Sequence, residues 1–578
     1  MQSFQVWAPA ATSVEIKIGE TQSPLRRAEG GWWKASIESA GPETSYCYLI
    51  DSDSYPLPDP RSPWQPEGVH GPSRTVDHSA FQWTDQNWQP PVWPKAIVYE
   101  LHIGTFTPEG NLDAAGKHLS YLKELGITHI ELLPVAAFPG KHGWGYDGVA
   151  LFAPHQPYGG PEALKRFVNA CHQQDLAVLL DVVYNHFGPS GNYTGKFGPY
   201  VTSHHHTPWG AAVNFEAAGS YEVRRFFCDN ALMWLRDYHF DGLRLDAVHA
   251  YIDRSAIHFM EQLSIEVEVL SAETQKKYVL IAESDLNAPH IIAPREDNGY
   301  GLDAQWSDDF HHAIVSILTG DQDGYYSDFG TIADLAKSLK QAYVYDGKYS
   351  AYRDCVHGRP AAHLPAWKFL GYAQNHDQVG NRMKGERLQH IAGTSRAKIA
   401  TALVLTAPFV PMLFQGEEWA ASTPFQYFTD HEDLELGRLV TEGRKKEFSA
   451  FGWKPEEVPD PQDKATFERS KLNWEEITQP EQAEMLGWYK KLIKLRQENP
   501  EITNGSFANV EVSYSEKAKW LVLHNGRILT AFSLAAKTAA LPIPPEAEIL
   551  IASDNKTEVQ DGKLYLSPDT VAILRTEK

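Results

Sequence analysis

Three carboxylic acids each stand directly after an apolar segment that is typical of a β-strand. They are Asp246, Glu283 and Asp377. Acids at the carboxyl ends of successive parallel strands are what the active site of a (β/α)8 barrel is made of. Carboxylates on separate strands can meet in space, and a pair of them can break a glycosidic bond. The residues alone therefore predict a glycosidase.

The neighbours of these acids suggest how the work would be divided. Arg244 stands two residues before Asp246, so both side chains share one face of the strand. The guanidinium would keep Asp246 ionised, as a nucleophile must be. Glu283 would be the proton donor, which requires a raised pKa. Asp377 would bind sugar hydroxyls and favour the positively charged transition state.

A repeated alternation of strand and helix patterns predicts the barrel that would bring these acids together. Eight segments are expected to form its strands: 96–106, 127–133, 177–183, 242–245, 278–282, 303–306, 369–374 and 409–414. The repeat is longer than the about 250 residues of a bare barrel. The excess must therefore form long loops, chiefly 187–219 and 417–480.

Short runs of alternating apolar and polar residues at both ends predict two smaller domains. Residues 1–90 are expected to form an immunoglobulin-like β-sandwich of the kind found in glycan-binding modules, and 88–94 reads as a Pro-rich linker. Residues 91–498 would hold the barrel, and 499–578 would form a second β-sandwich. The expected fold class is α/β, a (β/α)8 barrel flanked by two β-sandwich domains.

Composition narrows the range of partners and locations. The formal net charge of −22 over 578 residues repels nucleic acid and anionic membranes, so neither is an expected partner. No run of 18 apolar residues occurs, and the N-terminus lacks a basic region followed by an apolar stretch. The four cysteines lie far apart without a CxxC pair, a pattern that favours neither a disulfide framework nor a zinc site. We therefore expect a cytoplasmic protein.

Neither a metal ion nor any other cofactor is expected. The adjacent histidines His204, His205 and His206 could suggest a metal site, but neighbouring residues rarely converge on one ion. Asn185 has no visible cluster of oxygen ligands around it in the sequence, and we interpret it as holding the local loop geometry.

The strand ends are similar to the signature regions of the α-amylase family of glycoside hydrolases. The blocks that carry the resemblance lie between about 97 and 420 and occur in the family's order: 145–147, 181–186, 242–249, Glu283 and 376–377. The resemblance implies that Asp246 is the nucleophile, Glu283 the general acid/base and Asp377 the transition-state stabiliser. It further implies retention of the α-configuration through a covalent glucosyl-Asp246, with the two reacting carboxyl groups about 5–5.5 Å apart.

The same resemblance implies a set of residues that bind the glucosyl unit on the non-reducing side of the cut. They are Tyr146, Asp147, His186, Arg244 and His376. His249 stands where amylases of the family often carry lysine, and we expect it to bind substrate. Trp306 ends the sixth strand and is expected to stack on sugar. Asp308 follows that strand and is expected to bind the other side of the substrate.

A narrower set of segments resembles the members of this family that release trehalose from maltooligosyltrehalose. The segments are 184–193, 283–287, 305–312, 416–433 and 444–453. They imply hydrolysis of the α-1,4 bond between a maltooligosyl chain and a terminal trehalose unit. Maltooligosyltrehalose and related α-1,4-glucans are then the expected ligands, and another enzyme must supply the substrate.

Two alternatives remain at this point. A glycogen branching transferase shares the barrel, the acids and an N-terminal sandwich, and it differs only in what attacks the glucosyl-enzyme. The loops 187–219 and 417–455 favour the hydrolase. The second alternative is a catalytically inactive glycan-binding protein, but such a protein would have no need of all three acids.

Overall fold

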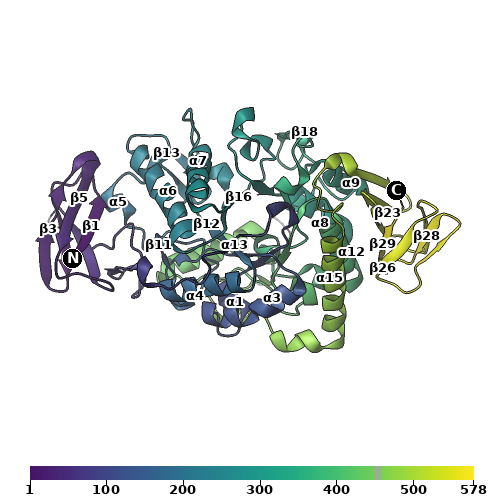
Figure 1. Cartoon of the computed structure of the whole chain (residues 1–578), viewed down its shortest axis with the longest axis horizontal. Helices are drawn as coiled ribbons and strands as arrows, with labels where there is room; N and C mark the ends of the chain where they lie inside the picture. Colours follow the sequence, from purple (N-terminus) through teal and green to yellow (C-terminus); the bar gives the residue numbers. More distant parts are fainter. Residues whose placement is uncertain (52, 450–453, 455–456, 578) are drawn as a thin grey trace.

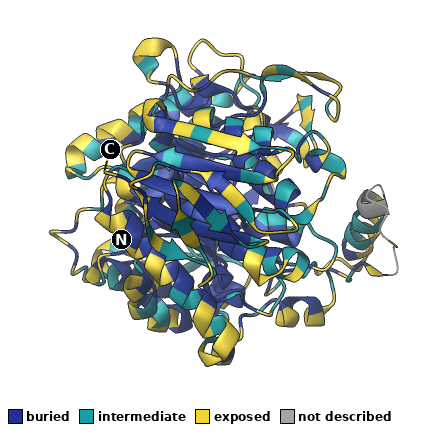
Figure 2. Ribbon diagram, turned by 90° about the vertical axis from the view of Figure 1, so that its right-hand side faces the viewer, coloured by how far each residue is buried: buried dark blue, intermediate teal, exposed yellow. Residues whose placement is uncertain are grey.

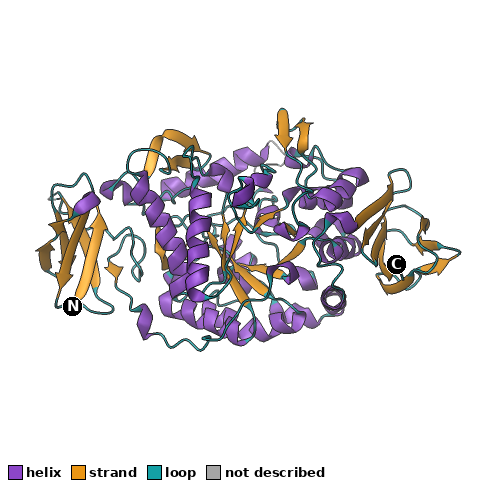
Figure 3. Cartoon of the chain, turned by 45° about the horizontal axis from the view of Figure 1, so that its top comes forward, coloured by secondary structure: helices purple, strands orange, loops and turns teal. Residues whose placement is uncertain are grey.

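Eight parallel strands close a barrel in the middle of the chain. The computed structural model describes residues 1–578 apart from 52, 450–453, 455–456 and 578. Each barrel strand pairs with the next one along the chain, and the last pairs with the first. The strands are β8 (Val98–Leu101), β9 (His129–Leu132), β12 (Ala177–Val182), β15 (Gly242–Leu245), β16 (Val279–Ala282), β17 (Ala304–Trp306), β20 (Phe369–Gly371) and β21 (Val410–Phe414). The predicted (β/α)8 barrel is confirmed (Figure 3).

The barrel strands are buried along their whole length, which explains their composition. A parallel strand that is covered on both faces has no side for polar residues, so mostly apolar runs form it. Figure 2 shows this buried centre. Helices pack around the barrel: α3 (Leu119–Leu125), α4 (Gly160–Gln173), α6 (Ser220–Asp237), α7 (Phe259–Thr274), α8 (Asp308–Thr319), α12 (Thr394–Thr406) and α15 (Pro480–Glu498).

The first barrel strand is shorter than predicted. The sequence pattern predicts a strand over 96–106, but β8 ends at Leu101 and a helical turn, α1 (Ile103–Phe106), follows it. The backbone N–H groups of Thr105 and Phe106 both donate to the carbonyl of His102, at 3.1 and 2.9 Å. A strand cannot continue through these residues because their N–H groups no longer reach a neighbouring strand.

Strand-rich regions flank the barrel at opposite ends of the molecule (Figure 1). At the N-terminal end the strands are β1 (Gln2–Trp7), β2 (Val14–Ile18), β3 (Thr21–Pro24), β4 (Arg26–Arg27), β5 (Trp32–Ile37), β6 (Ser45–Ile50) and β7 (Ser73–Arg74). At the C-terminal end they are β22 (Val510–Ser515), β23 (Trp520–Asn525), β24 (Ile528–Ser533), β25 (Ala539–Pro542), β26 (Glu548–Ala552), β27 (Glu558–Gln560), β28 (Lys563–Leu566) and β29 (Thr570–Arg575). Each set forms two sheets. The division into domains at residues 90 and 498 stays a prediction.

Long connections lie at the carboxyl ends of the barrel strands. The predicted loop 187–219 contains α5 (Thr194–Phe197) and the hairpin of β13 (Val201–Thr207) and β14 (Gly210–Val213). The region 417–480 is not one loop as predicted, because it contains the helices α13 (Leu434–Ser449) and α14 (Lys464–Arg469). Residues 450–453 of the segment 444–453 lie outside the described part of the chain.

The connection between β17 and β20 contains elements that the sequence analysis did not predict. They are α9 (Ile332–Gln341) and the hairpin of β18 (Asp346–Ser350) and β19 (Cys355–Gly358).

Among the described residues, none of the helices combines the length and apolar character that a membrane crossing requires.

Candidate active site

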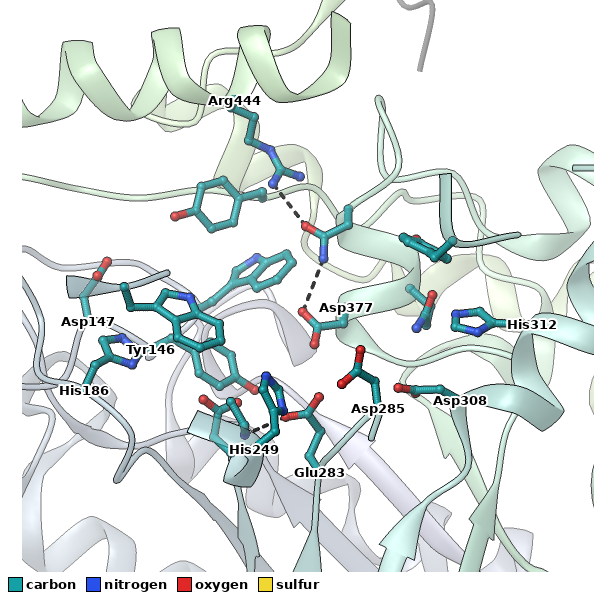
Figure 4. A pocket seen from close by; sticks show the side chains of 18 of the residues that line it. Tyr146, Asp147, His186, His249, Glu283, Asp285, Asp308, His312, Asp377 and Arg444 are labelled. Atoms are coloured by element: carbon teal, nitrogen blue, oxygen red, sulfur yellow. Dashed lines mark hydrogen bonds between the residues drawn. The ribbon is translucent and has the colours of Figure 1, made fainter. Parts of the chain in front are cut away.

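A cavity of about 690 Å³ opens at the carboxyl ends of the barrel strands. The structure brings the three predicted acids together there, since Asp246, Glu283 and Asp377 all line its wall. Five predicted substrate-binding residues also line the cavity (Figure 4): Tyr146, Asp147, His186, His249 and Asp308. The size is in the range of pockets that enclose small ligands.

Three other predicted residues lie beneath the cavity rather than on its wall. Arg244 and His376 are fully buried, and Trp306 is 2% exposed. The Arg244 guanidinium lies over the Trp306 ring, 4.2 Å from its centroid. The expectation that Trp306 contacts sugar directly is therefore wrong: its side chain turns inward from the short strand β17 and supports Arg244.

Arg244 connects the carboxylates of three strands. Its Nη1 donates to Oδ1 of Asp246 at 2.7 Å and to both oxygens of Asp181 at 2.8 and 2.9 Å. Its Nη2 lies 3.8 Å from Oε2 of Glu283. One guanidinium thus fixes Asp246 and approaches Glu283, so the two predicted reacting groups face the same point. Asp181 begins the block 181–186, but the sequence did not predict that its carboxylate would bind Arg244.

Glu283 has the surroundings of a proton donor. Burial raises its pKa well above the ordinary value of a glutamic acid. The neighbouring carboxylates of Asp246, Asp308 and Asp377 add to this effect, and Arg244 opposes it. The backbone N–H of Ala247 donates to Oε2 of Glu283 at 2.6 Å and holds the carboxyl group in place.

A buried relay of hydrogen bonds supports the floor of the cavity. Nδ1 of His376 lies 2.6 Å from Oε1 of Glu100, and its Nε2 lies 2.7 Å from the Tyr146 hydroxyl. Tyr146 in turn donates to Oδ2 of Asp181 at 2.5 Å. Burial opposes a charge on His376, but the carboxylates of Glu100 and Asp377 outweigh it and raise the pKa of His376 to about 9. His376 is therefore cationic at neutral pH.

Asp377 is held from above the cavity. It lies in the first turn of α10 (His376–Gly380). Asn381 Nδ2 donates to Oδ1 of Asp377 at 3.4 Å, and Arg444 Nη1 donates to Oδ1 of Asn381 at 3.1 Å (Figure 4). Arg444 also donates to the Gly380 carbonyl at 2.6 Å and lies over the Tyr427 ring. Helix α13 thus reaches back over the barrel to the predicted stabiliser.

The opposite end of the cavity from Asp147 carries further polar groups, among them Asp285 and His312 (Figure 4). Burial is the main cause that raises the pKa of Asp308 to about 7, and a hydrogen bond from the Tyr372 hydroxyl opposes it. Trp209 lines the cavity and is 46% exposed. A half-exposed indole at a cavity rim can cover the apolar face of a sugar.

No group of three or more His, Cys, Asp or Glu side chains is placed to hold a metal ion in the part of the chain that the structure describes. Of the three adjacent histidines, His205 pairs with Glu216, with 2.9 Å between its Nε2 and the nearer carboxylate oxygen. Arg254 contacts the same carboxylate.

Comparisons with known proteins agree with this geometry. A family model described as the α-amylase catalytic domain matches residues 76–204. A malto-oligosyltrehalose trehalohydrolase from Rhizobium sp. (strain M-11) is 47% identical over 99% of this chain and 97% of its own. One from Saccharolobus solfataricus is 44% identical over 92% and 90%. A crystal structure of a putative α-amylase from Salmonella typhimurium is similar with a TM-score of 0.91 and 36% identity, covering 99% of this chain and 97% of that one.

The barrel and its carboxylates thus define a glycosidase of the α-amylase type. Within that class, the near full-length similarity shows that the chain belongs to the malto-oligosyltrehalose trehalohydrolases.

Proposed function

We propose that this protein hydrolyses the α-1,4-glucosidic bond next to the terminal trehalose unit of maltooligosyltrehalose, releasing trehalose and a maltooligosaccharide. The observation that carries the proposal is the convergence of Asp246, Glu283 and Asp377 on one cavity, where Asp246 and Glu283 lie beside the same buried guanidinium. The near full-length similarity to trehalohydrolases supports the choice of substrate.

In the first step, a carboxylate oxygen of Asp246 attacks the anomeric carbon of the glucosyl unit. The glycosidic bond breaks as Glu283 gives its proton to the leaving oxygen, and trehalose departs. The raised pKa of Glu283 keeps that proton available. Asp377, held by Asn381, faces the positive charge that develops on the sugar ring. The product is a covalent glucosyl ester of Asp246.

In the second step, the ionised Glu283 takes a proton from water, and the water oxygen attacks the same anomeric carbon. The ester bond to Asp246 breaks and its carboxylate is restored. Two inversions leave the α-configuration in the released maltooligosaccharide. Glu283 is protonated again at the end of the cycle.

The ends of the cavity suggest which part of the substrate each binds. Tyr146, Asp147 and His186 would hold the glucosyl unit, with Arg244 and His376 supporting them from below. At the other end, three polar side chains would hold the trehalose unit: Asp285, Asp308 and His312. His249 would bind substrate between the two ends, because its ring lies 6.2 Å from that of Trp209, which stacks on His186.

The proposed reaction also implies a supplying enzyme and a cellular compartment. Another enzyme must make the trehalose-ended glucan that this one consumes. The four cysteines are free thiols, and this fits a reducing cytoplasm. The negative net charge of −22 fits a neutral substrate and no nucleic-acid or membrane partner.

The test uses purified maltooligosyltrehalose and, separately, amylose. We expect stoichiometric free trehalose from the first substrate, and a loss of that activity in Asp246→Asn. New α-1,6 branches in amylose without trehalose release would support a branching transferase instead. Binding without any product would support an inactive glycan-binding protein.

A further inference from the structure

Three aromatic side chains from distant parts of the sequence meet beside the N-terminal sheets. The Tyr55 and Tyr193 hydroxyls lie 3.2 Å apart, and Nδ1 of His70 lies 2.7 Å from the Tyr193 hydroxyl. The ring centroid of Tyr193 is 6.1 Å from that of Tyr55 and 5.9 Å from that of His70. We name these three residues the Tyr193 cluster.

Two members of the Tyr193 cluster are open to solvent: Tyr55 is 50% exposed, and the side chain of His70 is 41% exposed. Tyr193 itself is half-buried and packs against the hydrophobic core, which fixes its ring. The hydrogen bonds between the polar ends of the rings leave apolar ring surface facing water. Binding of a ligand to such rings costs little conformational entropy, because the rings are already ordered.

The cluster lies beyond the Asp147 end of the active-site cavity. Asp147 lines the cavity, and its Oδ2 is 3.9 Å from Nε2 of the buried His431. The next residue, Glu432, has Oε2 at 3.9 Å from Nε2 of His70. Two consecutive residues, His431 and Glu432, therefore contact the cavity wall and the cluster respectively, which places the cluster close to this end of the cavity.

The backbone makes the same connection by a second route. The segment from His186, which lines the cavity, to Tyr193 is only seven residues long. It is held next to Asp147, which lines the cavity, because the N–H of Gly188 donates to the carbonyl of the following residue, Gly148, at 3.1 Å. Both routes start at the end of the cavity that is assigned above to the glucosyl unit.

We propose that the Tyr193 cluster is an outlying subsite for the non-reducing part of long maltooligosyl chains. Amphipathic rings suit a glucan, because they offer an apolar face to the C–H surface of a sugar and polar atoms to its hydroxyls. The glucan is neutral, so the carboxylate of Glu432 beside His70 does not repel it. This inference rests on the proposed function, which sets the direction in which the glucan leaves the cavity.

The experiment compares kcat/KM for trehalose release from purified maltooligosyltrehaloses of increasing chain length. Tyr193→Ala and Tyr55→Ala should each lower kcat/KM about 3- to 10-fold on long chains, the effect of one aromatic contact, and leave it unchanged on the shortest. The loss should appear in KM rather than kcat. Tyr193→Phe, which keeps the ring, should retain most of the activity. Tyr514→Ala, which removes a 42% exposed tyrosine of the C-terminal sheet, is the matched control.

An equal loss at every chain length, or no loss at any, would overturn the inference while leaving the proposed function intact. A calorimetric measurement decides even if the wild type releases no trehalose from any substrate. In that case maltoheptaose should still bind the wild type more tightly than Tyr193→Ala, and maltotriose should bind both equally. Identical maltoheptaose affinities would reject the subsite.

Discussion

Glu283 must hold a proton when the substrate arrives, and its neighbours determine up to which pH it does so. Asp308 is one of the carboxylates that raise the Glu283 pKa. Since kcat/KM requires the protonated acid, it falls as the pH rises through that pKa. Asp308→Asn removes a negative charge, so the Glu283 pKa should fall and the alkaline limb of the kcat/KM profile should move to lower pH. A limb that stays in place or moves to higher pH would contradict this assignment.

The role of Glu283 as proton donor is tested by Glu283→Gln, which preserves the shape of the side chain and removes the carboxylic acid. We expect kcat to fall by about 10²–10⁴-fold, the usual contribution of general acid catalysis. The fold should persist, because the Ala247 N–H can still donate to the amide oxygen of the new side chain. Circular dichroism and steady-state kinetics check both points. Near wild-type turnover would remove Glu283 from the mechanism.

Arg444 is inferred to act on Asp377 through Asn381 and is therefore a positioning residue. Asn381→Ala should lower kcat roughly 3- to 10-fold, since it removes one hydrogen bond from the stabilising carboxylate. Arg444→Met should act in the same direction, and Arg444→Lys should recover part of the loss. The double variant should be no worse than the more impaired single one. Additive losses would show that the two residues work separately.

Sequence reasoning predicted the reacting acids well because each stands at a strand end, where barrel geometry makes side chains converge. It could not predict Asn381 and Arg444, since their contacts with Asp377 depend on how α13 returns over the barrel. Glu100 did carry a usable signal: it is a charged residue inside an apolar strand. Trp306 was misplaced because a strand's alternation sends neighbouring side chains to opposite faces, and a three-residue strand does not show which.

At the scale of elements, the segment 88–94 was predicted to be a linker, yet it starts with a buried anchor. Trp88 stacks on His172 of α4 and donates to Oδ1 of Asp241 at 2.7 Å. His172 lies between two carboxylates, at 2.7 Å from Asp85 and 3.0 Å from Asp241. Burial disfavours a charge on this imidazole, but the two carboxylates outweigh it and raise the pKa of His172.

This anchor joins the chain before the barrel to the start of β15, so its loss should lower the stability of the whole fold. His172→Phe removes the cation that lies between two buried carboxylates: Asp241 loses its cationic partner, and Asp85 keeps only His239, at 2.8 Å. We expect it to lower the free energy of unfolding by about 3–5 kcal/mol. His172→Gln, which keeps two hydrogen-bonding atoms, should be less damaging. Urea unfolding at neutral pH measures both. An unchanged free energy of unfolding in the Phe variant would mean that the contacts of His172 with Asp85 and Asp241 do not stabilise the fold.

The elements themselves were predictable in proportion to their apolar content. The barrel strands are buried on both sides and appear in the sequence as apolar runs. The helices of 417–480 were missed because α13 is largely polar and exposes Leu434 and Leu439. A polar helix over a cavity carries little periodic signal.

Across the whole molecule, the N-terminal sheets pack on the loop that shapes the active site. Trp7 contacts Tyr200 with 5.5 Å between ring centroids, and Tyr48 contacts Phe197 at 6.3 Å. Arg61 pairs with Asp229 of α6 at 2.8 Å. The buried apolar residues of both regions form one continuous cluster.

Removing residues 1–76 should therefore expose Phe197 and Tyr200 and loosen the loop that carries Trp209, while keeping the anchor residues Asp85 and Trp88. We expect a truncated chain starting at residue 77 to unfold at a lower temperature and to associate in size-exclusion chromatography, because newly exposed aromatic surface drives aggregation. Trp7→Ala in the full chain should show a smaller shift in the same direction. An equally stable, monomeric and active truncated protein would contradict this view of the N-terminal region.

The retaining mechanism through Asp246 is tested most directly by the configuration of the first product, followed by proton NMR immediately after enzyme is mixed with maltooligosyltrehalose. We expect equimolar trehalose and a maltooligosaccharide whose new reducing end is first the α-anomer, before mutarotation. The β-anomer appearing first would exclude a covalent glucosyl-Asp246, and no trehalose would exclude the proposed reaction.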